Sequence, residues 1–130
     1  MEQEPSMDDF WGMEFDWFAT DATGDIGIFC FGGYGFIPKE VLLHHETHSK
    51  YANQIPLPHF GSLLVWHDYA EFGFYVYDWN EEKRLYTRLA EPAQPLDVPL
   101  KKNILQIERL PSFTYNFQDK PAVSIAELTL

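Results

Sequence analysis

The densest group of residues able to do chemistry is the run His-His-Glu-Thr-His at positions 44–48. If this run is helical, His44 and His48 share one face, with Glu40 one turn earlier. Imidazole nitrogens and carboxylate oxygens are common zinc ligands. The spacing matches neither HExxH nor its inverted form, because Thr47 stands where the inverted motif needs glutamate. We therefore predict no metal and no cofactor. We favour a polar helix face, with a pH-sensitive partner contact involving His44, His45 and His48 as the alternative.

A glycine-rich segment, Gly32-Gly33-Tyr34-Gly35, follows an expected strand and precedes an expected helix. Backbone amides in such a place can hold a phosphate group. The segment lacks both the GxGxxG order and the Gly-Lys-Ser/Thr ending, and the acidic residues before it would repel an anion. We interpret these glycines as a turn or bulge that redirects the chain, with a loop adapted to a partner as the alternative.

Pairs of carboxylates are the next candidates for catalysis. Asp16 with Asp78 or Glu71 could hydrolyse a glycosidic bond if their elements face each other. A chain with 20 acidic residues contains coincidental pairs, so pairing alone does not identify an enzyme. No GxSxG elbow is present, and Cys30 lies in an apolar run without a base nearby in sequence. We predict a protein that is not an enzyme and assign no catalytic residue. A small carboxylate- or metal-dependent hydrolase is the less favoured alternative.

Aromatic and acidic residues alternate over positions 8–18 and again over positions 75–82. Rings surrounded by carboxylates can hold an arginine or lysine of another protein through stacking, cation–π attraction and charge-assisted hydrogen bonds. The alternative is that the rings belong to the core and the acids to the solvent face of the same strands. The residues predicted to bind a partner are Asp8, Asp9, Trp11, Glu14, Asp16, Trp17, Tyr75, Asp78, Trp79, Glu81 and Glu82.

The net charge points to the same kind of partner. The formal charge is -11, and the chain has eight acidic residues and no Lys or Arg before Lys39. Such a field attracts cationic surfaces and repels nucleic acid and anionic lipid, so we expect a basic protein partner, no nucleic acid and no membrane. The N-terminus resembles no signal peptide, no apolar run approaches ~18 residues, and a single cysteine suits a reducing compartment. We expect a soluble, cytoplasmic protein.

The length of 130 residues, with 45% hydrophobic and 22% charged residues, predicts one folded domain over 1–130, whose residues 1–12 form a loosely ordered acidic lead-in. A strand from position 14 and a second at 26–31 are expected to form a hairpin around Thr23-Gly24. Two helices follow in the prediction. They cover about 38–49 and about 59–72, the second ending at Gly73.

A second hairpin is expected from strands at 74–79 and 85–89, close to the first pair. Prolines indicate an extended surface segment over 92–99, and we favour a strand over helical turns at 104–110. Positions 113–117 alternate as in a strand, and the type of the last run, 123–128, stays open. The prediction is an α+β fold, a mainly antiparallel sheet with two helices inserted between its first and second hairpins.

These segments also resemble a known group of proteins. Phe15-Asp-Trp-Phe-Ala-Thr-Asp, then Gly24-Asp-Ile-Gly-Ile-Phe, Gly33 to Pro38, and Ala70-Glu-Phe-Gly-Phe-Tyr-Val-Tyr-Asp resemble, over residues 14–90, the small acidic immunity proteins encoded beside bacterial contact-dependent or polymorphic toxins. The resemblance implies a non-enzymatic inhibitor of a cognate toxin domain, often a nuclease with a basic cleft, in the cytoplasm of the producing cell.

The resemblance implies no site residues, because the interfaces of such proteins differ from member to member. The alternative function is a generic cytoplasmic protein-interaction or regulatory module. Convergence of the acidic residues on a closed cavity around an ion or a small ligand would contradict the inhibitor interpretation.

Overall fold

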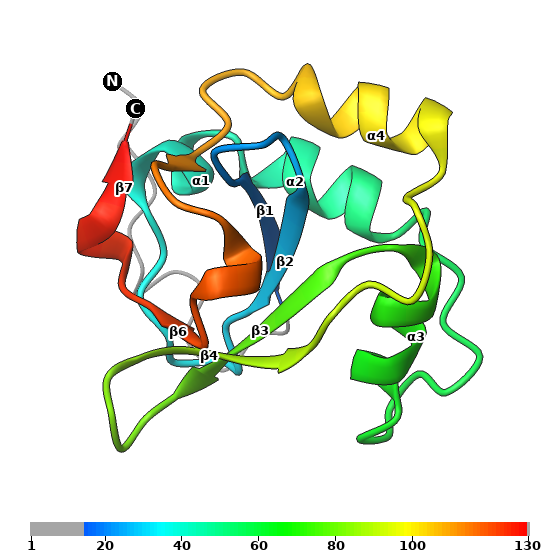
Figure 1. Cartoon of the computed structure of the whole chain (residues 1–130), viewed down its shortest axis with the longest axis horizontal. Helices are drawn as coiled ribbons and strands as arrows, with labels where there is room; N and C mark the ends of the chain where they lie inside the picture. Colours follow the sequence, from blue (N-terminus) through cyan, green and yellow to red (C-terminus); the bar gives the residue numbers. More distant parts are fainter. Residues whose placement is uncertain (1–14, 130) are drawn as a thin grey trace.

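The computed structural model describes residues 15–129, which form the expected α+β fold (Figure 1). One seven-stranded sheet has the order β6-β4-β3-β2-β1-β5-β7. Its strands are β1 (Asp16–Thr20), β2 (Ile26–Cys30), β3 (Tyr75–Asn80), β4 (Leu85–Ala90), β5 (Ser112–Phe113), β6 (Ala122–Val123) and β7 (Leu128–Thr129). The helices are α1 (Lys39–Leu43), α2 (His45–Ala52), α3 (Val65–Phe72) and α4 (Val98–Leu105), with short 3-10 helices at Phe117–Asp119 and Ile125–Glu127.

The two predicted hairpins are confirmed, and β2 of the first lies beside β3 of the second. The pairing of β2 with β3 is parallel, and so is that of β1 with β5, which makes the mainly antiparallel sheet mixed. The parallel pairing has a simple cause. The long helical connection between β2 and β3 brings the chain back to the end of the sheet at which β2 started.

The first turn is held by a buried carboxylate. Asp21 Oδ1 accepts hydrogen bonds from the backbone amides of Thr23 at 3.0 Å and Asp25 at 2.9 Å, as in an Asx turn. The other oxygen of Asp21, Oδ2, accepts a bond from the amide of Phe117 at 3.0 Å. Asp21 therefore fixes the hairpin and the C-terminal segment, and it is not one of the acidic groups available to a partner.

The helices between the hairpins differ from the prediction in number and in length. The helix expected at 38–49 is two helices, α1 and α2, because His44 leaves helical geometry with φ -120° and ψ 28°. The helix expected at 59–72 begins only at Val65, since the residues before it form turns with Gly61 at φ 84°. Gly73 caps this helix as predicted, with φ 121°.

The C-terminal third contains two further corrections. The strand favoured at 104–110 is wrong, because this run is the end of helix α4 and the turns after it. The proline-rich segment that we expected to be extended holds the start of α4. There, Asp97 Oδ2 accepts the Leu100 amide at 3.1 Å and Pro99 occupies the first turn. At 113–117 only Phe113 is in a strand, and 123–128 contains β6, a 3-10 helix and the start of β7.

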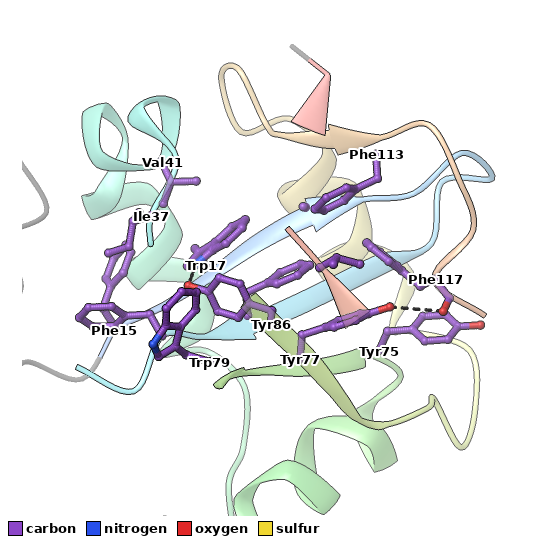
Figure 2. Close-up of a cluster of buried hydrophobic side chains, with 14 of the residues drawn as sticks. Phe15, Trp17, Ile37, Val41, Tyr75, Tyr77, Trp79, Tyr86, Phe113 and Phe117 are labelled. Carbon is purple, nitrogen blue, oxygen red and sulfur yellow. Dashed lines mark hydrogen bonds between the residues drawn. The ribbon is translucent and has the colours of Figure 1, made fainter. Parts of the chain in front are cut away.

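The sheet buries a different cluster on each face. One face carries stacked rings, in which Phe29 lies 4.4 Å from Trp17 and 5.0 Å from Tyr77 between ring centroids, and the C-terminal segment with Phe113 and Phe117 packs over them (Figure 2). The opposite face, with Phe18, Ile28 and Val76 among others, packs against α2, α3 and α4. Since side chains alternate along a strand, Asp16, Cys30 and Asp78 belong to this helix-covered face.

Candidate functional site

The helix-covered face contains a half-open pocket of about 280 Å³, which we call the acidic pocket. Its floor is a row of three side chains across β1, β2 and β3, because Asp16 is paired with Cys30 and Cys30 with Asp78. Paired residues on neighbouring strands point to the same side of a sheet. The described residues that line it are Phe15, Asp16, Cys30, Gly32, Gly33, Leu57, Phe60, Gly61, Ser62, Val65, Trp66, Tyr69 and Asp78.

The surrounding elements explain why this space is open. Gly32 and Gly33, at φ 65° and 90°, form the turn predicted after β2, and their missing side chains leave room beside Cys30. Trp66 and Tyr69 of α3 form the opposite wall. The hydroxyl of Tyr69 donates a hydrogen bond to Oδ2 of Asp16, which orients that carboxylate.

The electrostatics of the pocket are one-sided. Burial and, to a smaller extent, the nearby Asp16 together raise the pKa of Asp78 to about 6, and only a hydrogen bond with the Trp79 backbone acts in the opposite direction. Burial and the same two acids raise the pKa of the Cys30 thiol, so Cys30 stays protonated and is a poor nucleophile. Among residues 15–129, no Lys, Arg or His lines the pocket. A cation entering it would therefore meet the carboxylates of Asp16 and Asp78.

Exposed apolar side chains lie in the segment that contributes Phe60 to the pocket. Residues 57–64, here called the rim segment, carry Phe60, Leu63 and Leu64, which are 71%, 77% and 54% exposed. The buried Asp68 of α3 anchors this segment, accepting bonds from the His59 amide at 2.8 Å and from the His59 ring at 2.7 Å. A contiguous run of exposed apolar residues beside a charged pocket is typical of a protein-binding surface.

Of the residues that were predicted to bind a partner and lie within 15–129, only Asp16 and Asp78 meet in this pocket. The rings of Trp17, Tyr75 and Trp79 are 0%, 8% and 9% exposed, so they form the aromatic core, as the alternative interpretation had it.

The remaining predicted residues are placed elsewhere. Glu81 and Glu82 lie exposed in the turn after β3, where Glu81 accepts a bond from the Trp79 indole and forms an ion pair with Arg84 at 2.6 Å. Asp8, Asp9, Trp11 and Glu14 lie outside the described residues.

Sequence reasoning missed the rim segment. The helix predicted at about 59–72 included Phe60, Leu63 and Leu64, whereas these residues lie in turns before α3 and are exposed. The signal that could have revealed them is the pair of prolines at 56 and 58 with Gly61, which together disfavour a helix before Val65.

The histidine run is half-buried or exposed, as expected for the polar face that we favoured, except at His48. His48 is buried in the core, its Nδ1 accepts a bond from the Phe18 amide at 3.1 Å, and its ring stacks on Phe18. Burial, with a smaller effect of His44, lowers the pKa of His48 to about 3. Across residues 15–129, no group of three or more His, Cys, Asp or Glu side chains is arranged to hold a metal ion. Glu71, the other partner considered for a carboxylate pair, lies instead beside His67 at 3.3 Å.

Comparisons of the chain with protein-family models, curated proteins and solved structures gave no match. The resemblance to immunity proteins therefore gains no support from known relatives. None of the helices in the described part of the chain has the length and apolar character needed to cross a membrane.

Proposed function

We propose that this protein is a non-enzymatic binding protein for a basic protein partner, which it contacts through the acidic pocket and the rim segment. The observation that carries the proposal is a pocket that holds two carboxylates, Asp16 and Asp78, and is lined in part by the rim segment, whose side chains of Phe60, Leu63 and Leu64 are exposed. Interfaces with high affinity commonly join a buried polar or charged anchor to a surrounding apolar contact.

The charge of the chain supports this partner class. A net charge of -11 raises the encounter rate with a basic surface and disfavours nucleic acid and anionic membranes. The apolar rim then supplies contact area that charge alone does not provide, because exposed ion pairs contribute little to affinity. Charge thus favours the encounter, and the rim segment stabilises the complex.

The specific form that we propose is an immunity protein, which binds and inhibits a cognate toxin domain, such as a nuclease, in the cytoplasm. It is supported by the resemblance of residues 14–90 and by the charge, since a nuclease presents a basic cleft to its substrate. A gene for a large secreted toxin immediately upstream would favour this form. A generic interaction or regulatory module would use the same surface without such a neighbour.

The test of the proposed function is a substitution in the rim segment. The full-length tagged protein is used to capture partners from its native cytoplasm, and the dissociation constant of the purified partner is then measured by calorimetry. Leu63→Ser is expected to weaken binding about tenfold or more, because Leu63 is 77% exposed and free to contact a partner apolar surface. The expected partner is a basic protein.

A matched control is Leu105→Ser on α4, an exposed leucine outside the rim segment. This variant should bind the partner as tightly as the wild-type protein does. An acidic partner, or equal affinities of Leu63→Ser and wild type for a basic one, would contradict the proposed surface.

A second candidate function is a small carboxylate-dependent hydrolase. It is favoured by one observation, the raised pKa of Asp78 beside Asp16, which is the arrangement of an acid and a second carboxylate in glycosidases. Against it, one oxygen of Asp16 accepts the Tyr69 hydroxyl, and Cys30 lies between the two acids. Turnover of chromogenic glycosides that is lost in Asp78→Asn would replace the binding proposal with this one.

A further inference from the structure

We propose that the acidic pocket is a socket for one arginine side chain of the partner. The inference rests on the proposed function, since a basic protein is what would carry the arginine, and it names the group that the pocket recognises. Three features of the pocket match an arginine side chain: its space, the positions of its carboxylates and its aromatic walls.

The pocket has room for a long side chain. The pocket measures about 280 Å³ and adjoins a second hollow of about 440 Å³, with which it shares Phe15, Asp16, Leu57, Phe60 and Tyr69. It is half-open to solvent and is not a closed cavity around an ion, which is the arrangement that would have contradicted the binding interpretation. A long side chain projecting from a docked protein can enter such a space, with the rim segment covering its stem.

The positions of the carboxylates favour a guanidinium over an ammonium group. Asp16 and Asp78 are separated by Cys30, that is, by two inter-strand steps, or about 10 Å between their Cα atoms. Both side chains line the same pocket. A guanidinium has five donors in a planar fork and can bond to groups on two sides, whereas an ammonium is a compact point charge. Arginine is therefore the better match.

The aromatic walls favour the same group. Phe15, Phe60, Trp66 and Tyr69 all line the pocket, and a guanidinium stacks on such rings while its edge donates hydrogen bonds. Tyr69 also holds Asp16 in place through its hydroxyl. Ring faces and carboxylate oxygens in one small space are the two features that an arginine side chain uses together.

Charge also argues against a second copy of this chain as the occupant. Two molecules that each carry a net charge of -11 repel each other, and that repulsion opposes the insertion of one copy's arginine into the pocket of another. A shift to a dimer in sedimentation, lost in Asp78→Asn, would assign the pocket to self-association and overturn the proposal.

The test is a titration of the full-length protein with N-acetyl-arginine amide, followed by the NMR signal of the Trp66 indole, which lies in the pocket wall. A single residue should bind with a dissociation constant on the order of millimolar and shift this signal in a saturable way. N-acetyl-lysine amide should bind several-fold more weakly. Asp78→Asn should weaken arginine binding about tenfold.

The matched control is Asp119→Asn, which removes the same charge at an exposed site that does not line the pocket and should leave binding unchanged. Equal arginine affinity of Asp78→Asn and wild type, or an unshifted Trp66 indole, would overturn the socket. If the socket fails while Leu63→Ser still weakens the partner, the proposed function stands on the rim segment alone. If arginine binds as expected but no basic partner is captured, the proposed function fails and the socket remains.

Discussion

Replacing Phe29 with alanine is expected to lower the free energy of unfolding by about 3–5 kcal/mol, the range for a large aromatic side chain removed from a core. Phe29 is fully buried, and its ring is stacked on Trp17 and Tyr77 with Tyr86 at its edge. These three rings come from three different strands, and Phe113 and Phe117 add rings from two further elements, so no single element can move to fill the cavity. Urea unfolding monitored by circular dichroism measures the loss.

Phe60→Ala is the matched comparison, because it makes the same chemical change at a ring that is 71% exposed. Its stability should stay within about 0.5 kcal/mol of the wild-type value. Its partner affinity should fall, since Phe60 belongs to the rim segment. Equal losses of stability in the two variants would show that the rim segment is packed as part of the core, and the interface assigned to it would have to be withdrawn.

The second large effect is a loss of stability in acid that originates from His48. In the folded state, burial lowers the pKa of His48 to about 3, whereas a histidine in the unfolded chain has its ordinary pKa of 6.5. Below pH 6.5, His48 therefore binds a proton in the unfolded chain but not in the folded chain. The stability falls as a result until the pH approaches 3. Linkage gives a loss of about 3 kcal/mol between pH 7 and pH 4.

Asp78 contributes with the opposite sign. Its pKa of about 6 in the folded state is above the ordinary aspartate value of 3.8. Its contribution to the stability is therefore fully present at low pH and is lost as the pH rises through 6. Total stability thus combines two opposing terms, and the individual contributions become visible only in variants. At neutral pH, Asp78→Asn should be more stable than wild type by about 1–2 kcal/mol, after allowance for partial solvent exposure.

His48→Gln separates the histidine effect, because a glutamine oxygen can still accept the Phe18 amide bond but does not titrate. The variant should lose about 3 kcal/mol less than wild type between pH 7 and pH 4, as measured by urea unfolding at several pH values. Parallel stability curves for the two proteins would mean that His48 has the same pKa in the folded and unfolded states and is not the buried acceptor described above.

The hairpins could be predicted from sequence because their signals are local. Thr23-Gly24 between two apolar runs, and the β-branched and aromatic run at 75–79, specify strands without information from distant residues. The parallel pairing of β2 with β3 and the break at His44 depend on contacts between distant segments, which a local pattern does not contain. The missed helix α4 had a local signal, Asp97 with Pro99, but we gave more weight to the prolines as breakers.

Two residues of the candidate site could be predicted because their signal is local, and the rest could not because it depends on distant segments. Asp16 and Asp78 came from the alternation of acids and rings, and the register of the sheet placed both on one face. The same alternation could not show which rings are covered, because the covering residues, such as Phe113 and Phe117, come from the far end of the chain. The exposed side chains of the rim segment depend on turns, which hydrophobic spacing does not describe.

The central claim is that the carboxylate of Asp78, which lowers stability at neutral pH, serves to bind a cationic group of a partner. The most direct test is the dissociation constant of the captured partner, measured for wild type and Asp78→Asn at pH 7 and at pH 5. Because Asp78 titrates with a pKa of about 6, wild-type affinity should fall up to about tenfold at pH 5. Asp78→Asn should already bind about tenfold more weakly at pH 7 and change little with pH. Equal affinity and equal pH dependence of the two proteins would contradict the claim.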